Sequence, residues 1–350
     1  MMKKRKWTAM AAMATMTAAV FGNAAELPDP DGKPADMSKP VQVFILMGQS
    51  NMLGFGKINP EAKEGTLSHA VKTKGLYPYL IDDEGNWTVR KDVRYVRVMN
   101  TRHFNNEWMT IRGKIGPEMG IGHYVGNAVD APVMILKSCI GNRSLGWDLL
   151  PPGTPRYEVD GKEYPGYGET LTKKDRTIVK YDKEKAKTKE IWNWYAGKQY
   201  DSDIAAAKRV LADLDKYYPG AKDYEVAGFF WWQGDKDFRN KGHAAKYEEN
   251  LMHLLKALRK DFDAPEAKLV IATLGQTKKD AGGTQGQILN AMMSVADPRK
   301  YPENKGKVAT FYSNPVSKGG SSSGHYSRNA ETYMNVGEGM GKLMAELLAE

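Results

Sequence analysis

Short apolar runs recur along the chain and alternate with segments of helical spacing. Each run is bounded by Gly, Pro or polar residues, which is typical of a strand buried on both faces of a sheet. We predict a strand at each run. The runs cover residues 41–47 (VQVFILM), 132–138 (PVMILKS), 225–231 (EVAGFFW), 268–274 (KLVIATL) and 307–313 (KVATFYS).

Apolar residues at three- and four-residue spacing lie between and after these runs, as in helices that bury one face. Strands that alternate with helices form βαβ units, whose right-handed crossovers produce a parallel sheet covered on both faces. The sequence therefore predicts an α/β fold: a three-layer α/β/α sandwich with a central, mostly parallel sheet of about five strands, of the flavodoxin-like kind. The expected helices cover residues 120–129, 202–217, 243–262, 284–296 and 329–348.

One long segment, residues 151–199, interrupts the alternation. It contains a Pro-, Gly- and Tyr-rich piece, a lysine-rich piece and the aromatic stretch IWNWY at 191–195. The segment is too long for a plain connection in a compact domain, so we expect a lid-like insertion or a poorly ordered region. Its tryptophans either pack the insertion onto the core or offer aromatic faces to a ligand.

Residues 1–25 are predicted to form a secretory signal peptide. Four basic residues at 3–6 precede an uncharged stretch that ends in small residues, with cleavage expected after Ala24 or Ala25. The apolar stretch is short and poor in Leu and Ile for a membrane anchor, and no cysteine lies near the cleavage site to carry a lipid. We therefore expect a secreted or periplasmic protein. Residues 26–39 are predicted to be a linker or N-terminal arm, and residues 40–350 a single domain.

Charge and cysteine content exclude several classes of protein. The net charge of the 350-residue chain is +9, but losing the four basic residues of the signal leaves 47 basic against 42 acidic residues, a net +5. Because these charges are spread along the chain, they form no cluster of basic residues of the kind that binds nucleic acid. One cysteine, Cys139, excludes an internal disulfide and a cysteine-built zinc site. No metal-ligand spacing occurs around His69, His103, His123, His243 or His253.

Glycine-rich and polar segments follow four of the predicted strands. In a parallel sheet the carboxyl ends of the strands meet at one edge, where open α/β sheets bind their ligands. A serine, a glycine, a glutamine and a histidine reach that edge, and they supply a nucleophile, oxyanion donors and a base for acyl transfer. The four segments are Gly48-Gln49-Ser50-Asn51, CIGNRSLGW at 139–147, WQGDKD at 232–237 and Gly324-His325-Tyr326.

These motifs resemble the SGNH (GDSL-like) hydrolase superfamily, specifically the sialate O-acetylesterase and carbohydrate esterase family 6 type, which includes acetylxylan esterases. The resemblance spans residues 40–341 apart from the insertion. Its most specific element is GQSNM at 48–52. The other matching blocks are GPEMGIG at 116–122, LKSCIGNRSLGW at 136–147, WWQGDKD at 231–237 and the helix YEENLMHLLKALR at 247–259.

The resemblance implies that Ser50 is the nucleophile and that His325 is the base that takes its proton. It also implies an oxyanion hole built from the backbone N–H groups of Ser50 and Gly141, with the side-chain amide of Gln233 as a further donor. It implies an acetylated carbohydrate as substrate and requires no metal or organic cofactor. The candidate substrate-binding residues are Gln49, Asn51, Asn142, Arg143 and Trp147.

The sequence departs from the family at the acid that orients the histidine. The family ends in Asp-x-x-His, whereas Ser322 stands three residues before His325 here. Asp235, which replaces the glutamate of the family's Gln-Gly-Glu, is our first choice for the orienting acid. Asp237 is the other candidate, unless it is structural and holds the loop. A backbone carbonyl or a hydroxyl is the remaining partner for the histidine.

We expect an exported serine esterase that removes O-acetyl groups from carbohydrate through an acetyl-enzyme on Ser50. The departure at Ser322 motivates an alternative, a catalytically impaired carbohydrate-binding protein on the same fold. A third interpretation is a lipid- or thioester-directed hydrolase, although no long apolar lid helix is present in the sequence. The acetylated glycan, the acetyl position and the oligomeric state are left open.

Overall fold

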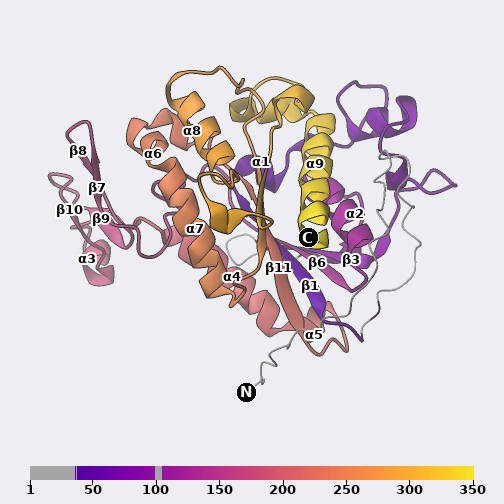
Figure 1. The fold of residues 1–350 in the computed structure, drawn as a ribbon, viewed down its shortest axis with the longest axis horizontal. Helices are drawn as coiled ribbons and strands as arrows, with labels where there is room; N and C mark the ends of the chain where they lie inside the picture. The colour runs from indigo at the N-terminus through magenta and orange to yellow at the C-terminus, as the bar shows by residue number, and fades with distance from the viewer. Residues whose placement is uncertain (1–35, 37, 99–104) are drawn as a thin grey trace.

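The computed structural model describes residue 36, residues 38–98 and residues 105–350 (Figure 1). The predicted signal peptide, nearly all of the predicted linker and His103 lie outside the described residues.

A seven-stranded sheet forms the centre of the molecule, in the order β13-β12-β11-β1-β6-β3-β4. The five predicted strands pair in parallel, and among themselves they follow the flavodoxin-like order. The predicted α/β class is confirmed. These five strands are β1 (Val41–Gly48), β6 (Val133–Ser138), β11 (Tyr224–Trp232), β12 (Lys268–Ala272) and β13 (Val308–Phe311).

Two further strands make the sheet larger than the predicted five. Strand β3 (Arg90–Val98) pairs in parallel with β6, and β4 (Asn105–Met109) pairs with β3 in the antiparallel sense. The sequence RKDVRYVRV of β3 mixes charged residues with valines, because this strand lies near the edge of the sheet. It therefore lacks the continuous apolar run that identified the other strands.

Helices cover both faces of the sheet, which gives the three layers (Figure 1). Alternate residues of β1 point to opposite faces, so Val43 and Ile45 join one core while Phe44 and Leu46 join the other. The first core is covered by α4 (Lys198–Ala212), α5 (Leu214–Tyr217), α7 (Tyr247–Asp261) and α8 (Gly283–Ser294). The second core is covered by α2 (Glu118–Ala128) and α9 (Ala330–Ala349).

The predicted helices are present, but two of them are divided. The 202–217 segment forms α4 and α5, and the 243–262 segment forms α6 (Lys241–Ala245) and α7. Short elements complete the described chain: α1 (Ser50–Leu53), β2 (Gly56–Lys57) paired with β5 (Lys114–Ile115), a π-helical turn His69–Thr73, and 3-10 turns Pro78–Leu80, Asp237–Arg239, Pro302–Asn304, Asn314–Val316 and Ser322–Arg328.

The 151–199 segment folds into small hairpins rather than irregular chain. It projects from one side of the body, beyond α6 (Figure 1). Its lysine-rich piece includes α3 (Lys183–Lys187), which begins with the Asp182 side chain accepting hydrogen bonds from two backbone N–H groups. The hairpins are β7 (Tyr157–Val159) with β8 (Lys162–Tyr164), and β9 (Glu169–Leu171) with β10 (Ile178–Lys180).

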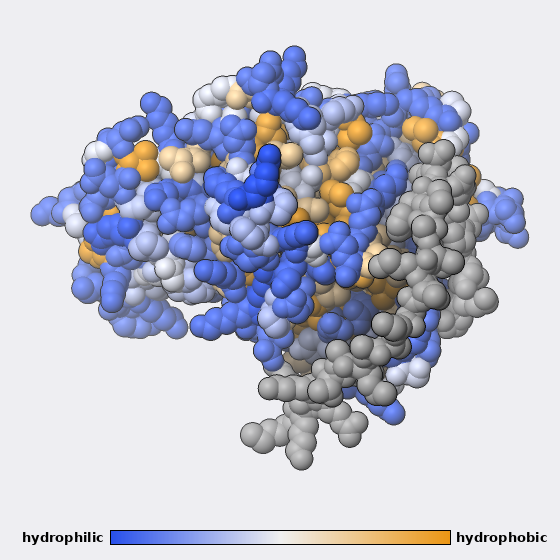
Figure 2. Space-filling view, in the orientation of Figure 1, coloured by the Kyte–Doolittle hydropathy of each residue, from blue (hydrophilic) through white to orange (hydrophobic). Residues whose placement is uncertain are grey.

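The face of the molecule drawn in Figure 2 is largely hydrophilic. Figure 2 shows polar residues over most of the face in view, with apolar residues in small groups. Within the described ranges, no helix combines the length and the apolar character needed to cross a membrane.

Candidate active site

Ser50 lies where the central strand β1 gives way to helix α1. Strand β1 ends at Gly48, whose φ is 146°, and a Cβ at this position would collide with the carbonyl oxygen of Trp232 at the end of β11. Only glycine permits this close approach of the two strands. Ser50 follows as the first residue of α1 and is 7% exposed. Its side chain therefore sits at the carboxyl edge of the sheet, as the sequence predicted.

The loop after β6 brings Gly141 against Ser50. A Cβ at Gly141 would lie 3.5 Å from Cβ of Ser50. Two buried carboxylates hold this loop. Asp148 accepts hydrogen bonds from the backbone N–H (2.9 Å) and Oγ (3.0 Å) of Ser144, and Asp237 accepts from the next two backbone N–H groups of the loop. The loop is thus anchored beside the candidate nucleophile.

Gln233, directly after β11, is fully buried between these two segments. Its Nε2 lies 3.1 Å from Oε1 of Gln49, 2.8 Å from the carbonyl oxygen of Arg143 and 2.5 Å from Oδ2 of Asp237. Its Oε1 accepts a hydrogen bond from the hydroxyl of Tyr247 at 2.8 Å. Every polar atom of the Gln233 side chain therefore has a protein partner.

His325 lies in the 3-10 segment Ser322–Arg328, with φ at 51° in the left-handed region. Its ring stacks on Phe55, with 4.1 Å between ring centroids and 10° between planes. Burial lowers the pKa of His325, the charge of Asp235 raises it, and two nearby cations lower it. The net direction is downward, so the ring is mainly neutral at neutral pH, as a general base requires.

Contacts through Asn51 and Tyr333 join the His325 segment to α1. Asn51 Nδ2 donates to the carbonyl oxygen of Ser322 at 3.4 Å, and the Tyr333 hydroxyl lies 3.4 Å from both Asn51 Oδ1 and the carbonyl oxygen of His325. The described residues give the ring nitrogens of His325 no hydrogen bond. Ser50 and His325 thus belong to adjoining segments, and no hydrogen bond joins their side chains directly.

Asp235 bonds the segment that carries His325 through hydroxyl groups. Its Oδ1 accepts from Oγ of Ser322 and from Oγ of Ser323, both at 2.7 Å. Its Oδ2 is 3.3 Å from a guanidinium nitrogen of Arg239, which also donates to Oγ of Ser323 at 3.0 Å. Ser322 occupies the position of the family's aspartate. Here the carboxylate of Asp235 contacts that position through its hydrogen bond with the Ser322 hydroxyl.

The predicted substrate-binding residues divide into buried and accessible ones. Gln49 is 3% exposed, and Asn51 is buried in the contacts described above. Asn142 is exposed, whereas Arg143 and Trp147 are partly exposed. Arg143 donates from Nε to Gln199 and lies over the Trp194 ring, 4.8 Å from its centroid, so the aromatic part of the insertion contacts the Gly141 loop.

Phe55 and Arg239 are site residues that the sequence did not identify. Phe55 supplies the ring against which His325 stacks, and Arg239 ties Asp235 to Ser323. Both lie a few residues from identified motifs, yet neither motif specifies the direction in which they point. Proximity to the motifs was the only signal available.

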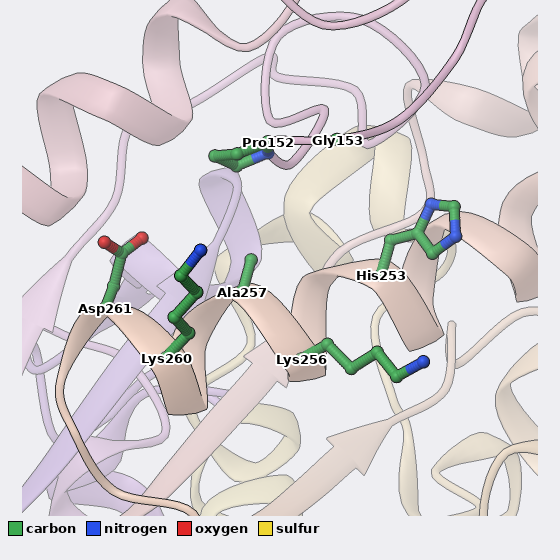
Figure 3. A pocket seen from close by; sticks show the side chains of 7 residues that line it. All are labelled: Pro152, Gly153, His253, Lys256, Ala257, Lys260 and Asp261. Atoms are coloured by element: carbon green, nitrogen blue, oxygen red, sulfur yellow. The ribbon is translucent and has the colours of Figure 1, made fainter.

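One cavity lies apart from these four segments. A cavity of about 330 Å³ lies between α7 and the base of the insertion (Figure 3). Its lining residues include Pro152, His253 and Lys260, none of which belongs to the segments around Ser50. In the part of the chain that the structure describes, no three His, Cys, Asp or Glu side chains are grouped to hold a metal ion.

A family model described as "carbohydrate esterase, sialic acid-specific acetylesterase" matches residues 183–345. This match confirms the family resemblance, and it includes Gln233, Asp235 and His325 but begins after Ser50 and Gly141. No curated protein matches the chain in sequence.

Three solved structures are similar to the chain. A protein from Arabidopsis thaliana is 14% identical with a TM-score of 0.50, over 87% of this chain and 98% of that one. XAC1771, titled a novel carbohydrate acetylesterase from Xanthomonas citri, is 12% identical with a TM-score of 0.45, over 86% of this chain and 55% of its own. NanS is 12% identical with a TM-score of 0.40, over 80% and 79%. At this identity, the Arabidopsis protein supports the fold alone.

Proposed function

We propose that the protein is a serine esterase that removes O-acetyl groups from carbohydrate. The observation that carries this proposal is the close approach of the Gly141 backbone to Ser50 at the sheet edge, beside the segment that holds His325. A nucleophile, a backbone donor and a neutral base are the elements that acyl transfer needs. The family match and the motifs quoted above support acetyl as the acyl group and carbohydrate as the alcohol.

In the proposed reaction, Ser50 Oγ attacks the acetyl carbonyl carbon while His325 takes the hydroxyl proton. The resulting oxyanion accepts hydrogen bonds from the backbone N–H groups of Ser50 and Gly141. Collapse breaks the bond to the sugar oxygen, which receives the proton from His325. Water then attacks the acetyl-enzyme with His325 as base, and acetate leaves as Ser50 recovers its proton.

The proposal requires the His325 ring to reach Ser50 when substrate is bound. Catalytic hydrogen bonds that are long or poorly aligned in a free enzyme tighten in the substrate complex. Asp235 is proposed to position the base through Ser322 and Ser323, because its carboxylate accepts from both hydroxyls. Its charge also favours the imidazolium that forms when Ser50 loses its proton.

The pH profile is expected to report His325. Because the neutral ring is the base and its pKa is lowered, kcat/KM should rise through one inflection below the ordinary histidine value and then reach a plateau. In Asp235→Asn a charge that raises this pKa is gone, so the inflection should move to lower pH. We expect kcat of Asp235→Asn to fall about 10- to 100-fold. This loss is smaller than the ~10⁴-fold loss in kcat when the acid removed is bonded directly to the histidine ring.

The measurement is kcat/KM for p-nitrophenyl acetate across about pH 4–8, for the wild type and Asp235→Asn. Asp297→Asn is the matched control, because Asp297 pairs with Arg299 on the surface. An inflection that stays in place, or moves to higher pH, in Asp235→Asn alone would contradict the positioning role.

A carbohydrate-binding protein without catalysis is the second candidate. The observation that favours it is the lack of a hydrogen-bond partner for the His325 ring among described residues, together with Ser322 at the family's aspartate position. Such a protein would bind acetylated glycan equally well with or without the Ser50 hydroxyl. Export to the periplasm or medium is part of the main proposal, and N-terminal sequencing of the mature protein tests it.

A further inference from the structure

We propose that Gln233 and Asp237 form a clamp that holds the two backbone donors of the oxyanion hole in place. This assigns Gln233 a positioning role rather than the donor role that the family resemblance implies. The inference rests on the proposed function, because it concerns the Ser50 and Gly141 N–H groups. In this clamp, the buried amide of Gln233 and the buried carboxylate of Asp237 join the turn before Ser50 to the loop after Gly141.

The amide nitrogen of Gln233 contacts both donor segments. It bonds Oε1 of Gln49, the residue before Ser50, and the carbonyl oxygen of Arg143, two residues after Gly141. The backbone N–H of Lys236 also donates to Oε1 of Gln49, at 3.2 Å. This second hydrogen bond holds the Gln49 oxygen near Gln233. A primary amide has two hydrogens, and Nε2 of Gln233 already has three protein acceptors. No hydrogen is left for a substrate oxyanion.

The orientation of the Gln233 amide follows from the groups around it. Trp231 Nε1 can only donate, and it lies 3.0 Å from the hydroxyl oxygen of Tyr247. The hydroxyl hydrogen of Tyr247 is therefore free to point at Gln233, whose side-chain Oε1 is 2.8 Å away and whose carbonyl oxygen is 3.2 Å away. With the oxygen held there, Nε2 faces Gln49, Arg143 and the carboxylate. Exchanging the two atoms would place an oxygen against a carboxylate, which is unfavourable.

Asp237 anchors the other side of the clamp. Oδ2 accepts from Gln233 and from the Leu145 N–H at 2.9 Å, and Oδ1 accepts from the Gly146 N–H at 2.8 Å. The residue is 0% exposed, and burial raises its pKa to about 6 while these hydrogen bonds oppose the rise. At neutral pH it is an ionised acceptor whose bonds are charge-assisted and strong. One carboxylate thus fixes the Gly141 loop and the amide together.

The clamp predicts a loss in kcat without a matching change in KM. The oxyanion exists only in the transition state and tetrahedral intermediate, so misplacing its donors affects the reaction more than binding. Gln233→Met keeps a similar length but removes the hydrogen bonds, and Asp237→Asn replaces the ionised acceptor. We expect each variant to lose kcat about 100-fold, the cost of a lost oxyanion donor, with KM changed less than about threefold.

Glu338→Gln is the matched control. Glu338 is a partly buried carboxylate on α9 that accepts a hydrogen bond from the Tyr79 hydroxyl at 2.7 Å, outside the four segments around Ser50. We expect this variant to keep kcat within about threefold of the wild type. The double variant Gln233→Met with Asp237→Asn should resemble each single variant, because both changes break the same unit.

The experiment measures kcat and KM for p-nitrophenyl acetate in these variants, with thermal unfolding as the check on folding. Additive losses in the double variant, wild-type kcat in Gln233→Met, or equal losses in Glu338→Gln and Asp237→Asn would each overturn the clamp. If Asp237→Asn does not fold, Gln233→Met against Glu338→Gln decides. Ser50→Ala runs in parallel: activity retained there refutes the proposed function, whereas loss there with normal Gln233→Met refutes the clamp alone.

Discussion

Ser50→Ala is expected to lose essentially all hydrolysis of p-nitrophenyl acetate while keeping its fold. Removing the nucleophile of a serine hydrolase lowers kcat by about 10⁶-fold and leaves only the residual effect of the oxyanion donors. The hydroxyl is a small group on a residue that is 7% exposed, so its loss should change stability little. The measurement is steady-state kcat, together with thermal unfolding of both proteins.

Ser68→Ala is the control for that variant. Ser68 is also buried, but its hydroxyl bonds the side chain of Asn59, outside the four segments around Ser50. It should keep wild-type kcat. If Ser50→Ala retains more than a hundredth of the wild-type rate, a different nucleophile is at work and the acetyl-enzyme on Ser50 is refuted.

His325→Ala should have the second-largest effect, a fall in kcat of about 10⁴-fold at neutral pH. Without the ring, the Ser50 hydroxyl has no base to take its proton and is a weak nucleophile. The loss should shrink as the pH rises, because hydroxide then takes over part of the proton transfer. Steady-state kinetics from neutral to alkaline pH measure both effects.

His253→Ala is the matched histidine control. His253 lies on α7, where its Nδ1 is 3.4 Å from the Thr154 hydroxyl, and it lines the cavity of Figure 3. This variant should keep normal kcat. A loss below tenfold in His325→Ala would remove His325 from the role of base and leave the stack on Phe55 as its function.

The central strands of the sheet could be predicted because the sequence of a fully buried strand is enough to identify it. β1, β6, β11 and β12 are covered on both faces, so selection for apolar residues leaves continuous runs. β3 was missed because it lies next to the edge strand and carries charged residues, so it lacks a continuous apolar run. Its pairing with β6 identifies it as a strand. The hairpins of the insertion were missed because each strand has only three residues.

The candidate site was predictable to the level of segments and no further. The rule that parallel strands end at one edge correctly brought Ser50 beside Gly141. The enclosure of the Gln233 amide by Gln49 and Asp237 depends on ångström-scale packing that no spacing encodes. The same is true of Asp235, which reaches the family's aspartate position through the Ser322 hydroxyl.

The central claim is most directly tested by acetate release from O-acetylated carbohydrate. Purified protein is incubated with acetylated xylan and with O-acetylated sialic acid, and acetate is quantified for the wild type and Ser50→Ala. We predict that the wild type releases acetate from at least one of these substrates and that Ser50→Ala releases none above background. Binding of both glycans by both proteins, with no acetate released by either, would contradict the esterase and favour the carbohydrate-binding protein.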